Sequence, residues 1–142
     1  NNGLIMLTFV PYFTTNQFND WMNEGDSIYY ATKNKYPGDS IILNKTLDKW
    51  EAENPMPLVG ISDMADHFDY VRKLIGVDHI GMAGDFDGIS FTIKGLENVS
   101  TYPNLLFELA KRGWTEAELK KITSGNFLRV FEDVEKVSQS MK

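Results

Sequence analysis

Two apolar runs that do not alternate with polar residues constrain the fold more than any other feature of the sequence. The first run is residues 3–10 and the second is residues 77–84. Such runs are typical of strands buried on both faces of a parallel sheet. Between them, Ser62 is a candidate N-terminal cap and Gly76 a C-terminal stop for a helix with a regular apolar stripe. A strand, a helix and a second strand in this order predict a parallel βαβ unit and an α/β fold class.

Two helical segments accompany this unit. Residues 16–57 carry apolar side chains at rough helical spacing among many Asn, Asp and Lys residues, so we expect a mostly helical excursion outside the main core. Residues 102–142 predict closing helices. One of these begins at a capping box, in which Thr115 is followed three residues later by Glu118.

The composition narrows the class of partner. The chain carries 14 Lys and Arg residues against 20 Asp and Glu residues, for a net charge of -6. No basic face is therefore expected for nucleic acid or an anionic membrane. The sequence contains no Cys, which excludes thiolate zinc sites and a cysteine nucleophile. Its longest apolar run falls far short of the ~20 residues of a membrane-spanning segment, so small molecules and proteins remain as partners.

Asp85 and Asp87 are the candidate catalytic residues, because they directly follow the second predicted strand. In an extended chain, residues two apart project to the same side. The carboxyl ends of parallel strands are also where α/β enzymes hold their sites. A turn in which the two carboxylates only bond nearby backbone N–H groups before Gly88 explains the same residues, so both interpretations stay open.

The two histidines, His67 and His79, are poor candidates for metal ligands. Neither has a second His or a carboxylate at the spacing of a recognised zinc motif. Structural or capping roles are expected for both.

From residue 76 to residue 89, the sequence resembles the strand-and-loop signature of the membrane (renal) dipeptidase family. The similarity continues in the family's order at residues 4–11, 66–71, 95–105, 112–115 and 125–131. The excursion, with Trp50 and residues 54–57, resembles the bacterial branch of the family rather than the shorter vertebrate form.

The resemblance implies a (β/α)8 barrel with two zinc ions, whose bridging water attacks the peptide carbonyl of a dipeptide. Such a barrel needs ~200–250 residues, so we expect this chain to be the C-terminal part of an incomplete TIM-type barrel. The family's His-x-Asp motif, bridging Glu, two later His and substrate-binding Arg would all lie upstream of Asn1. No residue here matches a zinc ligand, and we expect the isolated fragment to be inactive.

The resemblance also implies roles for individual residues. Asp85 matches the family's strand-end acid, which engages the substrate amine and handles the proton that the departing nitrogen needs. Asp87 and Gly88 are expected to shape the turn. Phe13 matches a position that lines the substrate cleft and carries Tyr in vertebrate members.

The expected partners are a dipeptide substrate and either the missing N-terminal part of the barrel or a second copy, which would cover the cut sheet edge. The alternative is a non-catalytic α/β domain or degenerate relative that acts as a protein-binding module, with a purely structural turn at Asp85. The upstream sequence discriminates between them, because His-x-Asp and two later His favour the enzyme.

Overall fold

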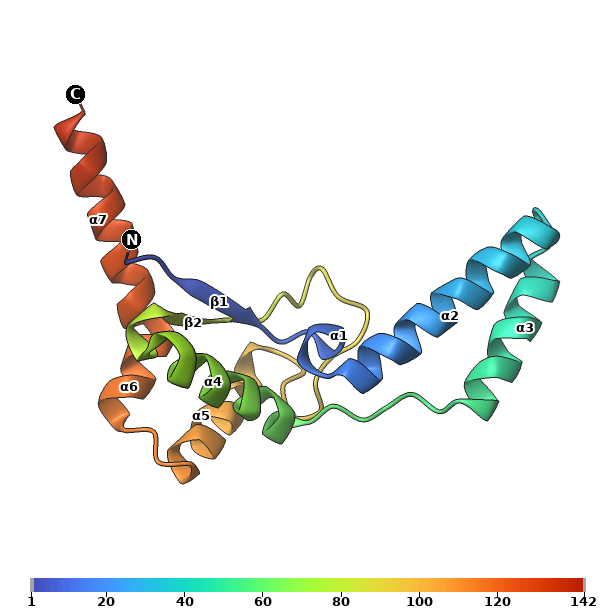
Figure 1. Cartoon of the computed structure of the whole chain (residues 1–142), viewed down its shortest axis with the longest axis horizontal. Helices are drawn as coiled ribbons and strands as arrows, with labels where there is room; N and C mark the ends of the chain where they lie inside the picture. Colours follow the sequence, from blue (N-terminus) through green and yellow to red (C-terminus); the bar gives the residue numbers. More distant parts are fainter. Residues whose placement is uncertain (1, 142) are drawn as a thin grey trace. The chain divides into compact units, whose positions relative to one another are not determined.

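The two predicted strands pair with each other in parallel. In the computed structural model, which describes residues 2–141, β1 (Ile5–Thr8) lies beside β2 (Ile80–Ala83) (Figure 1). Ile5 lies opposite Ile80, and Thr8 lies opposite Ala83. The expected α/β class with a parallel sheet is therefore confirmed.

The chain divides into two units. The strand unit comprises residues 2–10 and 60–141, and the helical unit comprises Pro11–Val59. The helical unit contains α1 (Pro11–Thr14), α2 (Asn16–Lys35) and α3 (Ser40–Glu53). Besides the strands, the strand unit contains α4 (Ile61–Ile75), η1 (Val77–His79), η2 (Val99–Thr101), α5 (Tyr102–Lys111), α6 (Glu116–Lys120), the π-helical turn η3 (Lys121–Gly125) and α7 (Asn126–Ser140).

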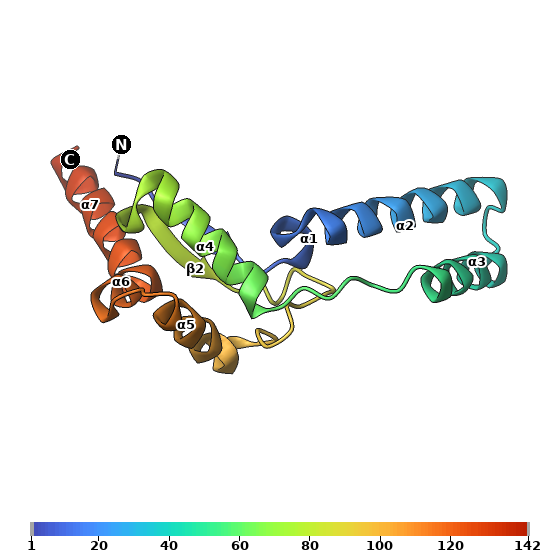
Figure 2. The same cartoon turned by 60° about the horizontal axis from the view of Figure 1, so that its bottom comes forward.

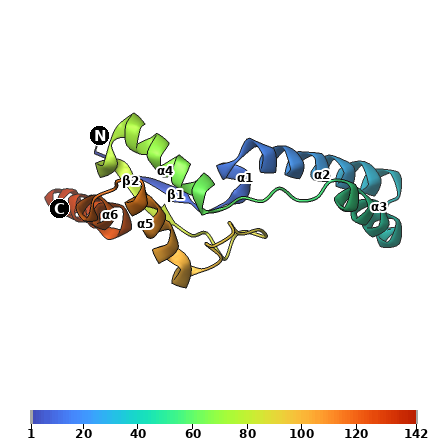
Figure 3. The same cartoon turned by 90° about the horizontal axis from the view of Figure 1, so that it is seen from below.

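The helices of the strand unit pack on one another and on β2. Helix α4 lies alongside β2 (Figure 2) and also contacts α5. Its buried face includes Met64, Ala65 and Phe68. Figure 3 shows α5 and α6 from below, and along the chain η3 then joins α6 to α7. The first half of the apolar stripe of α4 thus forms part of the core, as its spacing predicts, whereas Leu74 and Ile75 at its end are 65% and 36% exposed.

Helix α4 begins earlier than the sequence pattern indicates, and Ser62 is not its cap. Gly60 is the N-cap, and its N–H donates to the carboxylate of Asp63 at 2.8 Å. The hydroxyl of Ser62 instead accepts a hydrogen bond from Arg112 at 2.8 Å. Gly76 follows the last residue of α4 with a φ of 84°, a conformation that favours glycine and ends the helix.

The strands are shorter and less buried than the apolar runs predict. Residues 77–79 form a 3-10 turn before β2, and the side-chain amide of Asn126 donates to the carbonyls of Val77 (2.7 Å) and Ile80 (2.8 Å) on either side of it. On β1, Ile5 is 50% exposed. The expectation that β1 is buried on both faces is wrong within the described residues.

His79 has a structural contact, in line with the expected role. Its Nδ1 atom lies 2.8 Å from the carbonyl oxygen of Gly3, so the side chain links the segment before β1 to the segment before β2. Beside it, Arg129 donates to the carbonyl of Asp78 at 2.8 Å. The ammonium of Lys121 holds the pKa of the Asp78 carboxyl below its usual value.

Aromatic side chains hold the helical unit together. The indoles of Trp21 and Trp50 lie 5.2 Å apart between ring centroids, and the Trp21 indole N–H donates to the carbonyl of Asn54 at 2.8 Å. Asp39 caps α3 by accepting the N–H groups of Ile41 and Ile42. Residues 16–57 thus contain two helices that contact each other.

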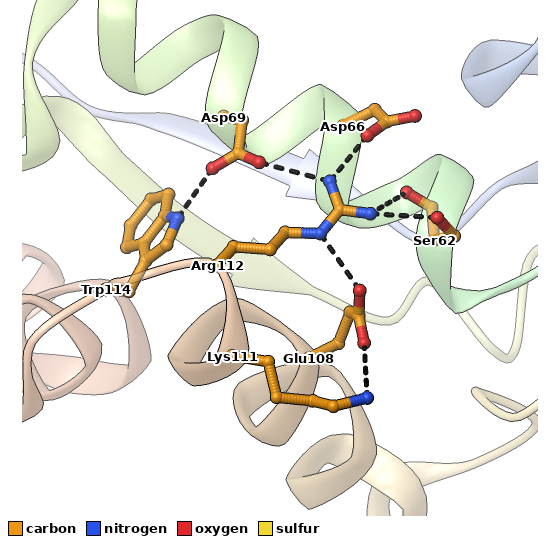
Figure 4. A network of polar contacts seen from close by, with 7 residues as sticks. All are labelled: Ser62, Asp66, Asp69, Glu108, Lys111, Arg112 and Trp114. Carbon is orange, nitrogen blue, oxygen red and sulfur yellow. Dashed lines mark hydrogen bonds and ion pairs between the residues drawn. The ribbon is translucent and has the colours of Figure 1, made fainter.

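A network of charged side chains centred on Arg112 joins α4 to the end of α5 (Figure 4). The guanidinium pairs with Asp66, with Asp69 at 3.1 Å and with Glu108 at 3.0 Å. Asp69 also accepts the indole N–H of Trp114 at 2.7 Å. The Asp66 carboxylate and then Glu108 raise the pKa of Arg112, and the guanidinium in turn lowers the pKa of Glu108. One side chain therefore links three acids from two helices.

The first prediction concerns this network. Arg112→Met keeps the aliphatic stem but leaves the surrounding acids without their cation, so we expect the free energy of unfolding to fall by about 2 kcal/mol in urea denaturation. Lys120→Met is the matched control, because its pair with Glu116 is 76% and 81% exposed. The control should change stability by less than about 0.5 kcal/mol. Equal losses in the two variants would contradict the prediction.

Candidate functional site

The strand-end acid Asp85 lies in a tight turn after β2. Its φ is 56°, in the left-handed region that residues other than glycine rarely adopt. Its carbonyl accepts the N–H of Gly88 at 3.0 Å, which closes the turn through main-chain atoms. Both Asp85 and Asp87 are exposed. The expectation that they project from an extended chain is wrong, because the left-handed residue ends the extended conformation of β2.

A cluster of three aromatic rings supports this turn. The aromatic cluster consists of Phe9, which follows β1, Phe86 in the turn and Tyr102 at the start of α5. Phe9 lies 5.1 Å from Tyr102 and 6.5 Å from Phe86 between ring centroids, in edge-on arrangements. The N–H of Phe9 donates to the carbonyl of Ala83 at 3.0 Å. The cluster thus joins the carboxyl ends of both strands to α5, and burial raises the pKa of the Tyr102 hydroxyl.

Gly84 is the position where these rings approach the main chain. A Cβ atom at this residue would lie 2.4 Å from the ring of Phe86 and 2.8 Å from the hydroxyl of Tyr102. Either distance is a clash, so any larger residue would displace the rings. Sequence reasoning missed Tyr102, because it lies 16 positions after Phe86 in the chain and no local pattern connects them. The sequence feature that could have indicated this close approach of side chains to the main chain is Gly84 itself, at the end of the predicted strand.

Phe13, the other expected site residue, belongs to the helical unit. It lies in α1 with 62% of its surface exposed, and its ring packs edge-on against Tyr12 at 4.5 Å between centroids. An exposed aromatic side chain is available to line a cleft. Phe13 and Asp85 belong to different units, so their meeting in one substrate site stays a prediction.

Residues 2–141 do not by themselves fit a binuclear metal site. No group of three or more His, Cys, Asp or Glu side chains that could hold a metal ion is found among them. Across the same residues, no helix has both the length and the apolar character needed to cross a membrane.

The parallel strand pair and the helices packed on it define an α/β protein, and comparison with known proteins identifies its family. The model of the family described as membrane dipeptidase (Peptidase family M19) matches residues 1–142. The chain belongs to this family, as the resemblance indicates. The family is one of metallopeptidases, which suggests a metal cofactor.

Similar proteins include mammalian and fungal dipeptidases. Dipeptidase 3 of Rattus norvegicus is 51% identical over 82 residues, which cover 58% of this chain and 17% of that protein. Dipeptidase 3 of Homo sapiens is 48% identical over 85 residues, or 60% of this chain and 17% of that protein. Dipeptidase aclJ of Aspergillus oryzae is 42% identical over 103 residues, or 72% of this chain and 24% of that protein. The chain therefore spans less than a quarter of each of these relatives.

A solved structure is similar over almost the whole chain. The probable dipeptidase PvdM from Pseudomonas aeruginosa superposes with a TM-score of 0.69 at 25% sequence identity. The superposition covers 95% of this chain and 38% of PvdM. The similarity therefore extends from sequence to three-dimensional structure.

Proposed function

We propose that this chain supplies the strand-end acid of a dipeptidase that hydrolyses dipeptides, as the C-terminal part of a (β/α)8 barrel. The observation that carries the proposal is the exposed carboxylate of Asp85 at the carboxyl end of β2, within a chain that belongs to the membrane dipeptidase family. The carboxyl ends of parallel strands are where barrel enzymes hold their catalytic groups. The similar proteins named as dipeptidases support the substrate class.

In this proposal Asp85 has two roles. Its carboxylate pairs with the protonated amino group of the dipeptide. It also accepts a proton from the water that attacks the carbonyl carbon and passes that proton to the amide nitrogen when the C–N bond breaks. The amine is a poor leaving group without that proton, so a positioned acid lowers the barrier to cleavage. Phe13 is proposed to line the substrate cleft with an apolar ring, without the hydroxyl that Tyr offers at the matching position of vertebrate members.

The proposed cofactor is a pair of zinc ions, and we propose that its ligands are residues other than residues 2–141. Residues 2–141 do not fit such a site, so no ligand is assigned among them. When bound, zinc ions supply Lewis-acid activation of water and of the scissile carbonyl. The chain's own contribution is the carboxylate of Asp85 and the turn that holds it.

The test of the proposed role is Asp85→Asn in the full-length enzyme. We expect kcat to fall by roughly 10² to 10⁴, the range for loss of a positioned proton-transfer group, with metal content near normal. Steady-state kinetics together with metal analysis measures both. Asp87→Asn is the matched control, since it makes the same change two residues away in the same turn, and it should cost much less. Near-normal turnover of Asp85→Asn would favour the non-catalytic alternative instead.

A second prediction concerns the chain alone. Because zinc ligands are proposed to lie outside it, the purified 142-residue chain should hydrolyse no dipeptide and retain no tightly bound zinc after dialysis. Metal analysis and a dipeptide assay on one sample check this. Two zinc ions held per chain would refute the proposed division of the site.

The strand unit presents apolar surface that we propose is covered in the assembled enzyme. Along one face of α7, Phe127 and Phe131 stack with centroids 6.2 Å apart, and Val134 and Val137 continue the exposed stripe. Burial of apolar surface contributes about 25 cal/mol per Å². Even a few hundred Å² therefore favours association by several kcal/mol before the entropy of docking. The proposed partner is the N-terminal part of the barrel or, without it, a second copy.

Light scattering of the purified chain at micromolar concentration checks this proposal. We expect the 142-residue chain to self-associate when no N-terminal part is present, because α7 and β1 both expose apolar side chains. A monodisperse monomer that melts cooperatively would contradict it and would indicate an independent α/β domain.

A further inference from the structure

The carboxylate of Asp85 lies against Gly88, across its own turn. A Cβ atom built on Gly88 would lie 2.9 Å from Oδ1 of Asp85 and 3.6 Å from its Cγ. Real Cβ atoms essentially never come that close, so the carboxylate, as the end of a flexible side chain, would have to move. The volume that a side chain at residue 88 would occupy is therefore already filled by the acid that the proposed function depends on.

Gly88 is not required by its backbone conformation. Its φ is not positive, in contrast to the φ of Gly76 and three other glycines. Its N–H closes the turn by donating to the carbonyl of Asp85, and any residue except proline supplies that N–H. The expectation that Gly88 shapes the turn does not account for the absence of a side chain at this position. The Asp85 carboxylate, which occupies the place of that side chain, does account for it.

The main chain of the turn has little freedom to move away from a side chain at residue 88. On the other side of Asp85, Gly84 is in close contact with Phe86 and Tyr102. Asp85 itself occupies the left-handed region, where few backbone adjustments are available to a residue with a side chain. A Cβ at residue 88 would therefore displace the carboxylate rather than the main chain.

We propose that Gly88 is a positioning residue, whose missing side chain leaves the Asp85 carboxylate in place for substrate binding and proton transfer. The inference rests on the proposed function of Asp85. It concerns a residue that does not itself touch the substrate and acts only through the orientation of Asp85. Displacement of a catalytic group by about 1 Å is enough to slow a reaction severely.

The experiment is a double-mutant cycle in the full-length enzyme, with Gly88→Ala, Asp85→Ala and the double variant. Gly88→Ala should lower kcat by about 10- to 100-fold when Asp85 is present. In the Asp85→Ala background it should change kcat by less than about 2-fold, because no carboxylate remains to be displaced.

Gly125→Ala is the matched control for replacement of a glycine by alanine. Gly125 has helical angles, and a Cβ there would meet its nearest neighbour, the carbonyl oxygen of Lys120, at 3.4 Å. We expect its kcat to stay within about 2-fold of the unmodified enzyme.

Every result of the double-mutant cycle either supports the inference or overturns it. Equal losses of kcat in both backgrounds would show that residue 88 acts through the fold, and unchanged kcat in Gly88→Ala would show that the carboxylate needs no space there. Either result overturns the inference and leaves the role of Asp85 intact. If Gly88→Ala fails to fold, recovery of a folded double variant supports the contact with Asp85, and failure to recover overturns it. Normal turnover of Asp85→Ala would instead overturn the proposed function itself, and the inference with it.

Discussion

The parallel pairing of β1 with β2 is the interaction on which the rest of the strand unit depends. It fixes both strands in one direction, so that their carboxyl ends reach the same edge. The pairing extends one step beyond the strands through the bond from Phe9 to Ala83. That step brings Phe9 next to the turn that carries Asp85. The position of the candidate catalytic acid thus follows from a main-chain register set several residues before it.

The two ends of the strand pair are stabilised by different chemistry. At the amino end, two side chains from α7 satisfy backbone carbonyls, with Asn126 and Arg129 donating to the segment around η1. At the carboxyl end, the aromatic cluster packs beneath an exposed turn. The hydrogen bonds at the amino end satisfy main-chain carbonyls, while the exposed turn at the carboxyl end leaves a carboxylate accessible to a ligand. In the barrel proposed above, the carboxyl end of the strands would carry the chemistry and the amino end would serve stability.

Membership of the membrane dipeptidase family and the local geometry at Asp85 support the same proposal from independent directions. The family match covers residues 1–142, whereas the chain spans only 17% to 24% of its dipeptidase relatives described above. In the proposed function, the chain is one contributor to a composite site, to which it brings the carboxylate of Asp85 and apolar surface for the remaining parts to cover.

Local sequence patterns determined the elements, and tertiary contacts determined the site. The apolar runs, the stripe of α4 and the capping box at Thr115 specify strands and helices through interactions within a few residues, and these could be predicted. The left-handed conformation of Asp85, the approach of Tyr102 to Gly84 and the binding of Ser62 by Arg112 could not. Each depends on groups brought together by packing across tens of residues, or on space taken by a neighbouring side chain. Periodicity and spacing carry no information about which distant atoms fill that space, so only the folded chain decides where the carboxylate of Asp85 can lie.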